Sequence, residues 1–124
     1  IQREGEQAFR EIEAVVLHEL LEGPSAVIAT GGGTPCERDH LVRMRQAGKV
    51  IWLDVPMDRL MPRIERAGGD RPLLFGLKGD ALRERVEGLL EERAACYAAA
   101  DIIVQAGASA AEVAERIRAV VAIN

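Results

Sequence analysis

Hydrophobic positions along the chain follow two spacings, one typical of amphipathic helices and one typical of buried strands. Spacings of three and four predict helices over residues 4–22, 37–47, 58–66, 80–97 and 108–121. Short apolar runs rich in β-branched residues predict strands over residues 26–30, 50–55 and 101–105. Asp80 is the expected N-cap of the fourth helix, and Ser109 or its neighbour that of the fifth. Strands that alternate with helices predict βαβ units and a parallel sheet.

The length of the chain and its loops predict how it is organised. Glycines and a proline interrupt residues 67–79, which show little helical periodicity and are expected to form a mobile loop. With 124 residues, the chain is long enough for one modest domain and too short for two. Three strands are few for a parallel sheet, which needs cover on both faces, and the first residue is Ile1. We therefore expect residues 1–124 to form a single partial domain of a longer protein.

Three consecutive glycines, Gly31, Gly32 and Gly33, follow the first predicted strand directly. In open α/β sheets, ligands bind at this carboxyl end of the strands. Because glycine lacks a Cβ atom, its backbone N–H groups can closely approach an anion or a sugar hydroxyl. The alternative is a tight turn that binds nothing, and the glycines alone do not decide between the two.

Three arginines lie at positions where an anionic partner is expected. Arg93 shares the apolar face of the fourth helix, where an unpaired charge is costly. Arg10 has Glu6 four residues earlier and Glu13 three residues later, so an intrahelical ion pair with either can hold its guanidinium. Arg71 lies in the predicted loop, next to a proline that gives the loop one rigid point. For each arginine taken alone, a solvated position or an internal ion pair is the commoner outcome.

The composition argues against nucleic-acid and membrane partners and favours ligands that carry a carboxylate or phosphate. A formal net charge of −4 argues against general nucleic-acid binding, which needs a basic surface. No apolar stretch approaches the ~20 residues that cross a bilayer, and no signal peptide is visible, so we expect a cytoplasmic protein and no membrane partner. Only Lys49 and Lys78 are lysines among 16 basic residues. Arginine suits two-pronged recognition of carboxylate and phosphate better than lysine does.

Four segments, taken in order, resemble the shikimate kinase family: GEQAFREIE at residues 5–13, ATGGG at 29–33, DRPLL at 70–74 and ERAACYAAAD at 92–101. Each segment alone is a weak signal, but four in the family's order and spacing are specific. The resemblance implies an α/β fold of the P-loop, nucleoside-monophosphate-kinase type, a parallel sheet with flanking helices. It also implies transfer of the ATP γ-phosphoryl group to the 3-hydroxyl of shikimate, with Mg²⁺, in aromatic amino-acid biosynthesis.

The resemblance also implies roles for residues of a substrate site. Arg10 and Arg93 correspond to the pair that grips the shikimate carboxylate, and Glu13 corresponds to the acid that steadies Arg10. The three glycines correspond to the floor of the site, with Gly32 the best candidate for a backbone N–H contact.

On the nucleotide side, the resemblance implies that Arg71 is the lid arginine that reaches the ATP phosphates. Arg66 corresponds to a residue beside the adenine. Near residues 107–110, small side chains stand where the family often has a residue next to the base.

Two parts of the family pattern are absent from these 124 residues. They are the GxxxxGK[ST] loop that holds the ATP phosphates and the acidic pair that supplies the base toward the substrate hydroxyl. We expect both upstream of Ile1, with the first two strands of the family sheet and most of the ATP and Mg²⁺ contacts. One of those strands lies between residues 26–30 and 50–55 in the family. Without it two apolar strand edges stay unpaired, so we expect this segment alone neither to fold stably nor to phosphorylate anything.

Two alternatives to the kinase stay open. A domain of this kind can act as a non-catalytic sensor of a small cyclic carboxylate within a regulator. The complete set of Arg10, Glu13, the three glycines and Arg93 favours the kinase, because a sensor of another ligand can lose that set. A different small-molecule P-loop kinase is the weaker alternative, since paired carboxylate-binding arginines do not suit a substrate that lacks a carboxylate.

Overall fold

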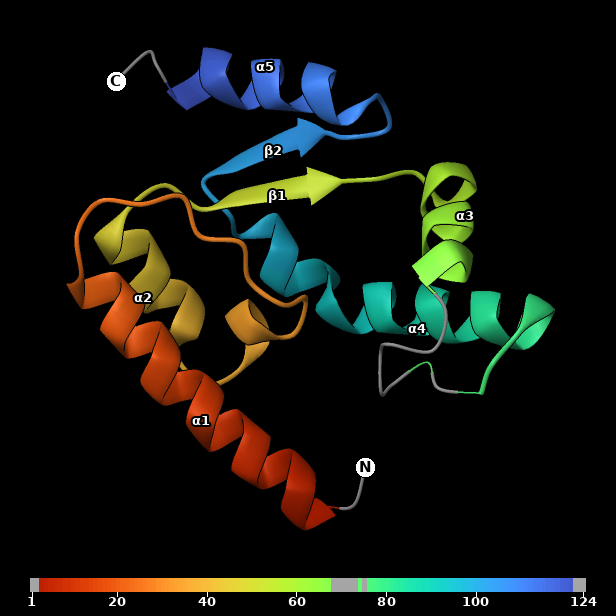
Figure 1. Cartoon of the computed structure of the whole chain (residues 1–124), viewed down its shortest axis with the longest axis horizontal. Helices are drawn as coiled ribbons and strands as arrows, with labels where there is room; N and C mark the ends of the chain where they lie inside the picture. Colours follow the sequence, from red (N-terminus) through yellow and green to blue (C-terminus); the bar gives the residue numbers. More distant parts are fainter. Residues whose placement is uncertain (1–2, 68–73, 75, 122–124) are drawn as a thin grey trace. The chain divides into compact units, whose positions relative to one another are not determined.

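The computed structural model describes residues 3–67, 74 and 76–121, and it divides into two compact units, Ile1–Val50 and Ile51–Asn124. The first unit contains α1 (Arg3–Glu22), the short 3₁₀ helix η1 (Thr34–Cys36) and α2 (His40–Ala47), all labelled or traceable by colour in Figure 1. The second contains β1 (Ile51–Asp54), α3 (Met57–Ala67), α4 (Gly79–Ala98), β2 (Ile102–Gln105) and α5 (Ala110–Val121).

In the first unit, α1 packs against α2 and ends at Glu22; the N–H of the next residue, Gly23, donates to the carbonyl of Leu20 at 3.2 Å. The predicted helix over residues 4–22 is therefore confirmed. Its apolar stripe, however, is covered only in part. Leu17 is buried, whereas the side chains of Phe9, Ile12 and Val16 are largely exposed.

The predicted strand over residues 26–30 is not formed. These residues carry no regular secondary structure, and the side chain of Val27 is fully exposed. A strand is stabilised by ladder hydrogen bonds to a neighbour and by burial of its side chains. Within the described ranges only β1 and β2 pair with each other, so the apolar run has no ladder and, apart from the half-buried Ile28, little burial.

In the second unit, β1 and β2 form a parallel pair, in register from Ile51 opposite Ile102 to Asp54 opposite Gln105. The Ala106 N–H extends the ladder by donating to the Asp54 carbonyl at 2.9 Å. Helix α5 packs on β2, which Figure 1 shows beside it. The parallel pairing predicted from the βα alternation is confirmed for these two strands. Apolar side chains of both strands and of α5 form the core beneath them: Val104, Ala106 and Val113 are buried, and Ile51 and Ile117 pack against them.

A second core joins α3 and α4, with Met61, Ile64, Leu74, Leu82 and Val86 buried. Residues 68–73 and 75 of the predicted loop 67–79 lie outside the described residues. Its described part is anchored, because Leu74 belongs to this core.

The two predicted helix caps had different outcomes. Asp80 is not the N-cap of α4, because the helix begins one residue earlier, at Gly79, and Lys78 occupies the cap position in an extended conformation. Gly79 has φ of +58°, a conformation that glycine adopts at little cost. Ser109 does cap α5, since its Oγ accepts a hydrogen bond from the N–H of Glu112 at 3.3 Å.

The second predicted helix, over residues 37–47, begins later than expected, at His40. The first three residues after the glycines form η1, with Pro35 in its first turn. This turn positions the site described next.

Candidate functional site

Arg10, on α1, lies between two carboxylates. Its Nη1 donates to Oε1 of Glu13 at 2.9 Å, and its Nε lies 3.5 Å from Oε1 of Glu37. The guanidinium also lies over the ring of Phe9, 5.4 Å from its centroid. Burial alone would lower the pKa of Arg10. The hydrogen bond and charge of Glu13, with the charges of Glu37 and Glu6, outweigh that effect and raise the pKa above its ordinary value.

One edge of Arg10 has no hydrogen-bond acceptor in the part of the chain that the structure describes. Its Nε is buried, yet among the described residues it has no hydrogen-bond partner. The Glu37 carboxylate is near enough for an ion pair but makes no hydrogen bond to it. A buried donor of this kind is costly unless something accepts from it. A carboxylate that approached this edge would satisfy it, since a guanidinium offers paired N–H groups in the geometry of a carboxylate.

Glu13 is the fixed counter-charge of Arg10. Its side chain is 12% exposed, and its second oxygen, Oε2, accepts a hydrogen bond from Oγ1 of Thr34 at 2.5 Å. Burial acts to raise the pKa of Glu13 and is the largest single influence. The hydrogen bonds from Thr34 and Arg10, together with the charges of Arg10 and His40, prevail and lower the pKa below its usual value. Glu13 is therefore held as a carboxylate at neutral pH.

The three glycines lead directly into this network. Thr34 donates its backbone N–H to the carbonyl of Gly31 at 3.2 Å, and the N–H of Cys36 donates to the carbonyl of Gly33 at 3.1 Å. Gly31 and Gly32 are exposed and Gly33 is half-buried. The structure thus brings Arg10, Glu13 and the glycine segment together in one unit through Thr34; that these residues bind a substrate remains a prediction.

Arg93 lies in the other unit, on α4, and is half-buried. It makes no ion pair or hydrogen bond with the part of the chain that the structure describes. One turn further along α4, Tyr97 packs against Trp52 of β1, with ring centroids 5.6 Å apart. The convergence of Arg93 with Arg10 joins two separate units and remains a prediction.

Arg66, the residue expected beside the adenine, lies at the end of α3. It lines a surface hollow of about 430 Å³ with Asp58, Arg59, Pro62 and Arg63. Arg59, Arg63 and Arg66 recur at spacings of four and three and so share one helix face. Nη2 of Arg63 reaches the carbonyl of Ala108 at 3.4 Å. Arg71, the expected lid residue, lies outside the described residues.

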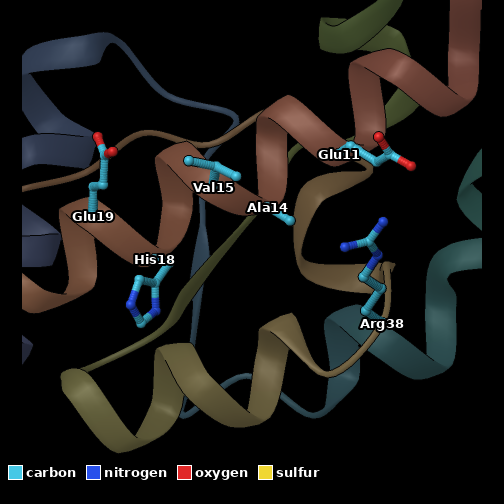
Figure 2. Close-up of a pocket in the computed structure, with 6 residues that line it drawn as sticks. All are labelled: Glu11, Ala14, Val15, His18, Glu19 and Arg38. Carbon is cyan, nitrogen blue, oxygen red and sulfur yellow. The ribbon is translucent and has the colours of Figure 1, made fainter.

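Another hollow, of about 560 Å³, follows the side of α1 shown in Figure 2. Five of its lining residues come from α1, among them Val15 and His18, and the sixth is Arg38, just before α2. The hollow is shallow and open, and it contains none of the predicted site residues.

The described ranges 3–67, 74 and 76–121 contain no candidate metal site: no cluster of three or more His, Cys, Asp or Glu side chains there could hold a metal ion. Nor does any helix within those ranges combine the length and the apolar character that a membrane span requires.

Comparison with known proteins decides the family. The family model described as shikimate kinase matches residues 1–122. The chain belongs to the shikimate kinase family. The shikimate kinase of Synechococcus sp. is 44% identical over 117 residues, which are 94% of this chain and 58% of that protein. The shikimate kinase of Gloeobacter violaceus is 43% identical over 114 residues, 92% of this chain and 62% of that protein. The chain thus spans about three fifths of these curated relatives.

Solved shikimate kinases share the fold. The crystal structure from Bacteroides thetaiotaomicron matches with a TM-score of 0.86 and 35% identity, covering 94% of this chain and 69% of that one. The structure from Acinetobacter baumannii, in complex with shikimate, matches with a TM-score of 0.83 and 28% identity, covering 98% of this chain and 68% of that one. The expected P-loop kinase fold class is confirmed by these shikimate kinases.

Three members of the Arg10 network were not predicted from the sequence: Thr34, Glu37 and His40. Thr34 directly follows the glycines, which is the one sequence signal that could have drawn attention to it. His40 is 3% exposed and its Nδ1 lies 2.7 Å from the carbonyl oxygen of Thr34. Its burial depends on how α1, η1 and α2 pack, and no local pattern reports that.

Proposed function

We propose that the complete protein transfers the γ-phosphoryl group of ATP to the 3-hydroxyl of shikimate. Family membership supports a kinase of this class. The observation that carries the proposal is the set of contacts that the Arg10 guanidinium makes and leaves open. The half-buried carboxylate of Glu13 fixes this guanidinium from one side, and the Nε–H of Arg10 has no hydrogen-bond acceptor among the described residues. That arrangement suits capture of a carboxylate, the group that distinguishes shikimate from most other substrates of small-molecule kinases.

In this proposal the shikimate carboxylate accepts hydrogen bonds from the Nε edge of Arg10 and from Arg93. Each charge-assisted hydrogen bond of this kind contributes about 1.5–3 kcal/mol. Two anchors on one carboxylate also fix the orientation of the ring, so that one hydroxyl faces the phosphoryl donor. Backbone N–H groups at Gly31–Gly33, with Gly32 foremost, contact the ring hydroxyls from below.

The nucleotide would be held largely by residues other than those of this chain. The GxxxxGK[ST] loop is absent from the sequence, and the described residues offer no cluster fit for Mg²⁺. ATP and Mg²⁺ are therefore assigned mainly to the part of the family fold that these residues do not include. This chain contributes arginines to ATP binding. Arg66 lies beside the adenine, with Arg59 and Arg63 on the same helix face, and Arg71 reaches toward the phosphates. We place the reaction in the cytoplasm.

Steady-state kinetics on the complete gene product test the proposal. Arg93→Ala should raise the KM for shikimate about 10- to 100-fold, the loss of one charge-assisted anchor, and leave the KM for ATP nearly unchanged. Arg71→Ala should act chiefly on kcat, because a lid arginine stabilises charge on the transferring phosphoryl group. Arg83→Ala is the matched control on α4, since Arg83 is half-exposed and lies 3.7 Å from Glu87 in a surface ion pair.

A shikimate KM that stays unchanged in Arg93→Ala contradicts the substrate assignment. Binding of shikimate without any phosphorylation by the complete protein would favour the sensor alternative instead. The relatives described above are kinases, and no observation on this chain favours a regulator.

A further inference from the structure

We propose that Thr34 is a positioning residue that sets the orientation of Arg10 by way of Glu13. Thr34 thereby also links Arg10 to the glycine segment, Gly31–Gly33. The inference rests on the proposed function, because it assigns a specific task within the proposed shikimate site. Thr34 itself touches no reacting atom. It acts through a neighbour, and its effect is therefore expected on substrate capture.

Thr34 is the meeting point of three parts of the first unit. Its hydroxyl donates to Glu13 on α1 at 2.5 Å. Its backbone N–H donates to the carbonyl of Gly31 at 3.2 Å, and a Cβ placed on Gly31 would lie 3.5 Å from the threonine Oγ1. Its own carbonyl accepts from His40, the first residue of α2.

The chemistry of Glu13 explains why this contact matters. Each carboxylate oxygen has one strong donor: Arg10 on Oε1 and Thr34 on Oε2. Two donors on the two oxygens fix both the position and the plane of the carboxylate. With the hydroxyl removed, Oε2 loses its partner in a place that water reaches poorly, because Thr34 is 6% exposed. The carboxylate is then free to rotate, and the guanidinium that it holds turns with it.

His40 keeps Thr34 in place. A carbonyl oxygen only accepts hydrogen bonds, so the 2.7 Å contact requires the proton to lie on Nδ1 of His40. The ring is almost wholly buried, and the bond fixes the backbone of η1 at the residue whose side chain holds Glu13. A chain of hydrogen bonds thus runs from α2 to Thr34, Glu13 and Arg10. The packing of α2 therefore sets the distance between Arg10 and the glycine segment, through these hydrogen bonds.

The test compares three variants of the complete gene product. Thr34→Val removes the hydroxyl and keeps the shape, whereas Thr34→Ser keeps the hydroxyl and removes the methyl. Val42→Thr is the matched control, because it makes the opposite exchange at an exposed position of α2. Two quantities are measured: the pKa of Glu13 from ¹³C-carboxyl NMR titration, and the KM values for shikimate and ATP.

Thr34→Val should raise the pKa of Glu13 and raise the shikimate KM about tenfold, with the ATP KM within twofold of the parent. The charged groups that face Glu13 in that titration are Arg10 on its own helix and His40 on α2, with Glu37 next to Arg10. Thr34→Ser should restore both quantities, and Val42→Thr should match the parent. In a Glu13→Ala background, Thr34→Val should add little to the shikimate KM, because the side chain that links Thr34 to Arg10 is already lost.

Equal changes in the KM values for shikimate and ATP would overturn the proposal, as would a folded Thr34→Val protein with parental Glu13 pKa and shikimate KM. A Thr34→Ser variant as impaired as Thr34→Val would show that the methyl group matters and would overturn it too. Should Thr34→Val not fold, Thr34→Ala takes its place in both measurements. Failure of the parent to phosphorylate shikimate would refute the proposed function alone, since the NMR titration still reports whether Thr34 holds Glu13.

Discussion

Replacing Glu13 by glutamine tests how far its charge stabilises the first unit. Glutamine has nearly the same shape and can still accept from Arg10 through its amide oxygen, while its amide NH₂ can donate to Oγ1 of Thr34. Glu13→Gln therefore removes the negative charge and leaves both hydrogen bonds possible, one from the charged Arg10 guanidinium and one between neutral groups. Any loss of stability then reports the charge and not a cavity.

The expected magnitude follows from the two contacts at 2.9 Å and 2.5 Å. Hydrogen bonds to charged groups contribute about 1.5–3 kcal/mol and neutral ones about 0.5–1.5 kcal/mol. The bond to Thr34 becomes neutral, and the bond to Arg10 keeps its charged donor but loses the charge of its acceptor, so the two changes together amount to about 2 kcal/mol in the free energy of unfolding. Because the Glu13 side chain is only 12% exposed, solvent screening reduces this value little.

Urea unfolding of the complete gene product at several pH values measures the effect. The pKa of Glu13 is lowered in the folded state, so its contribution is fully present above the unfolded value of about 4.3 and is lost as the pH falls through the folded pKa. The parent should exceed Glu13→Gln by about 2 kcal/mol at pH 7, and the gap should shrink as the pH falls below about 4.

Glu19→Gln is the control, because Glu19 is an exposed residue of the same helix. It should change the free energy of unfolding by less than about 0.5 kcal/mol. A gap between parent and Glu13→Gln that is absent at pH 7, or that persists unchanged at acid pH, refutes the reasoning.

Three further outcomes are expected. Glu37→Gln should lower the shikimate KM about two- to fivefold in steady-state assays, because this 41% exposed carboxylate competes with the substrate carboxylate for Arg10; an increase would mean that Glu37 assists binding. Gly107→Ala should cost about 1 kcal/mol in urea unfolding, since its Cβ would lie 3.2 Å from Cδ of Pro56; equal stability would show that the proline ring gives way. Residues 1–124 expressed alone should show no cooperative thermal transition by circular dichroism, because the apolar stripe of α1 and Val27 are exposed; a sharp melt would contradict this.

Local patterns predicted most of the fold. The helices α1, α3, α4 and α5 appear within one or two residues of the predicted bounds, because the 3.6-residue period and the stop signals are properties of neighbouring residues. The strand expected over residues 26–30 is absent for the opposite reason. A strand depends on a partner that is distant in sequence, and an apolar run shows that a segment can pair but not that a partner is present.

The contacts of the candidate site were also predictable only where the residues are close in sequence. The ion pair of Arg10 with Glu13 spans three residues; helical spacing offered Glu6 and Glu13 as partners, and the family resemblance indicated Glu13. Thr34 and His40 lie 21 and 27 residues beyond Glu13, and their roles arise where three short elements meet. Polar side chains that link separate elements leave no periodic signal. The motif resemblance led to the glycines next to Thr34 but not to the threonine itself.

The contact between Trp52 and Tyr97 gives the second unit an optical reporter. Trp52 is the sole tryptophan of the chain, and its ring lies against Tyr97 with an interplanar angle of 46°. Tyr97 is on α4, one helical turn beyond Arg93. Any displacement of that turn alters the environment of the indole, so intrinsic fluorescence within this chain follows events at Arg93 without a chemical label.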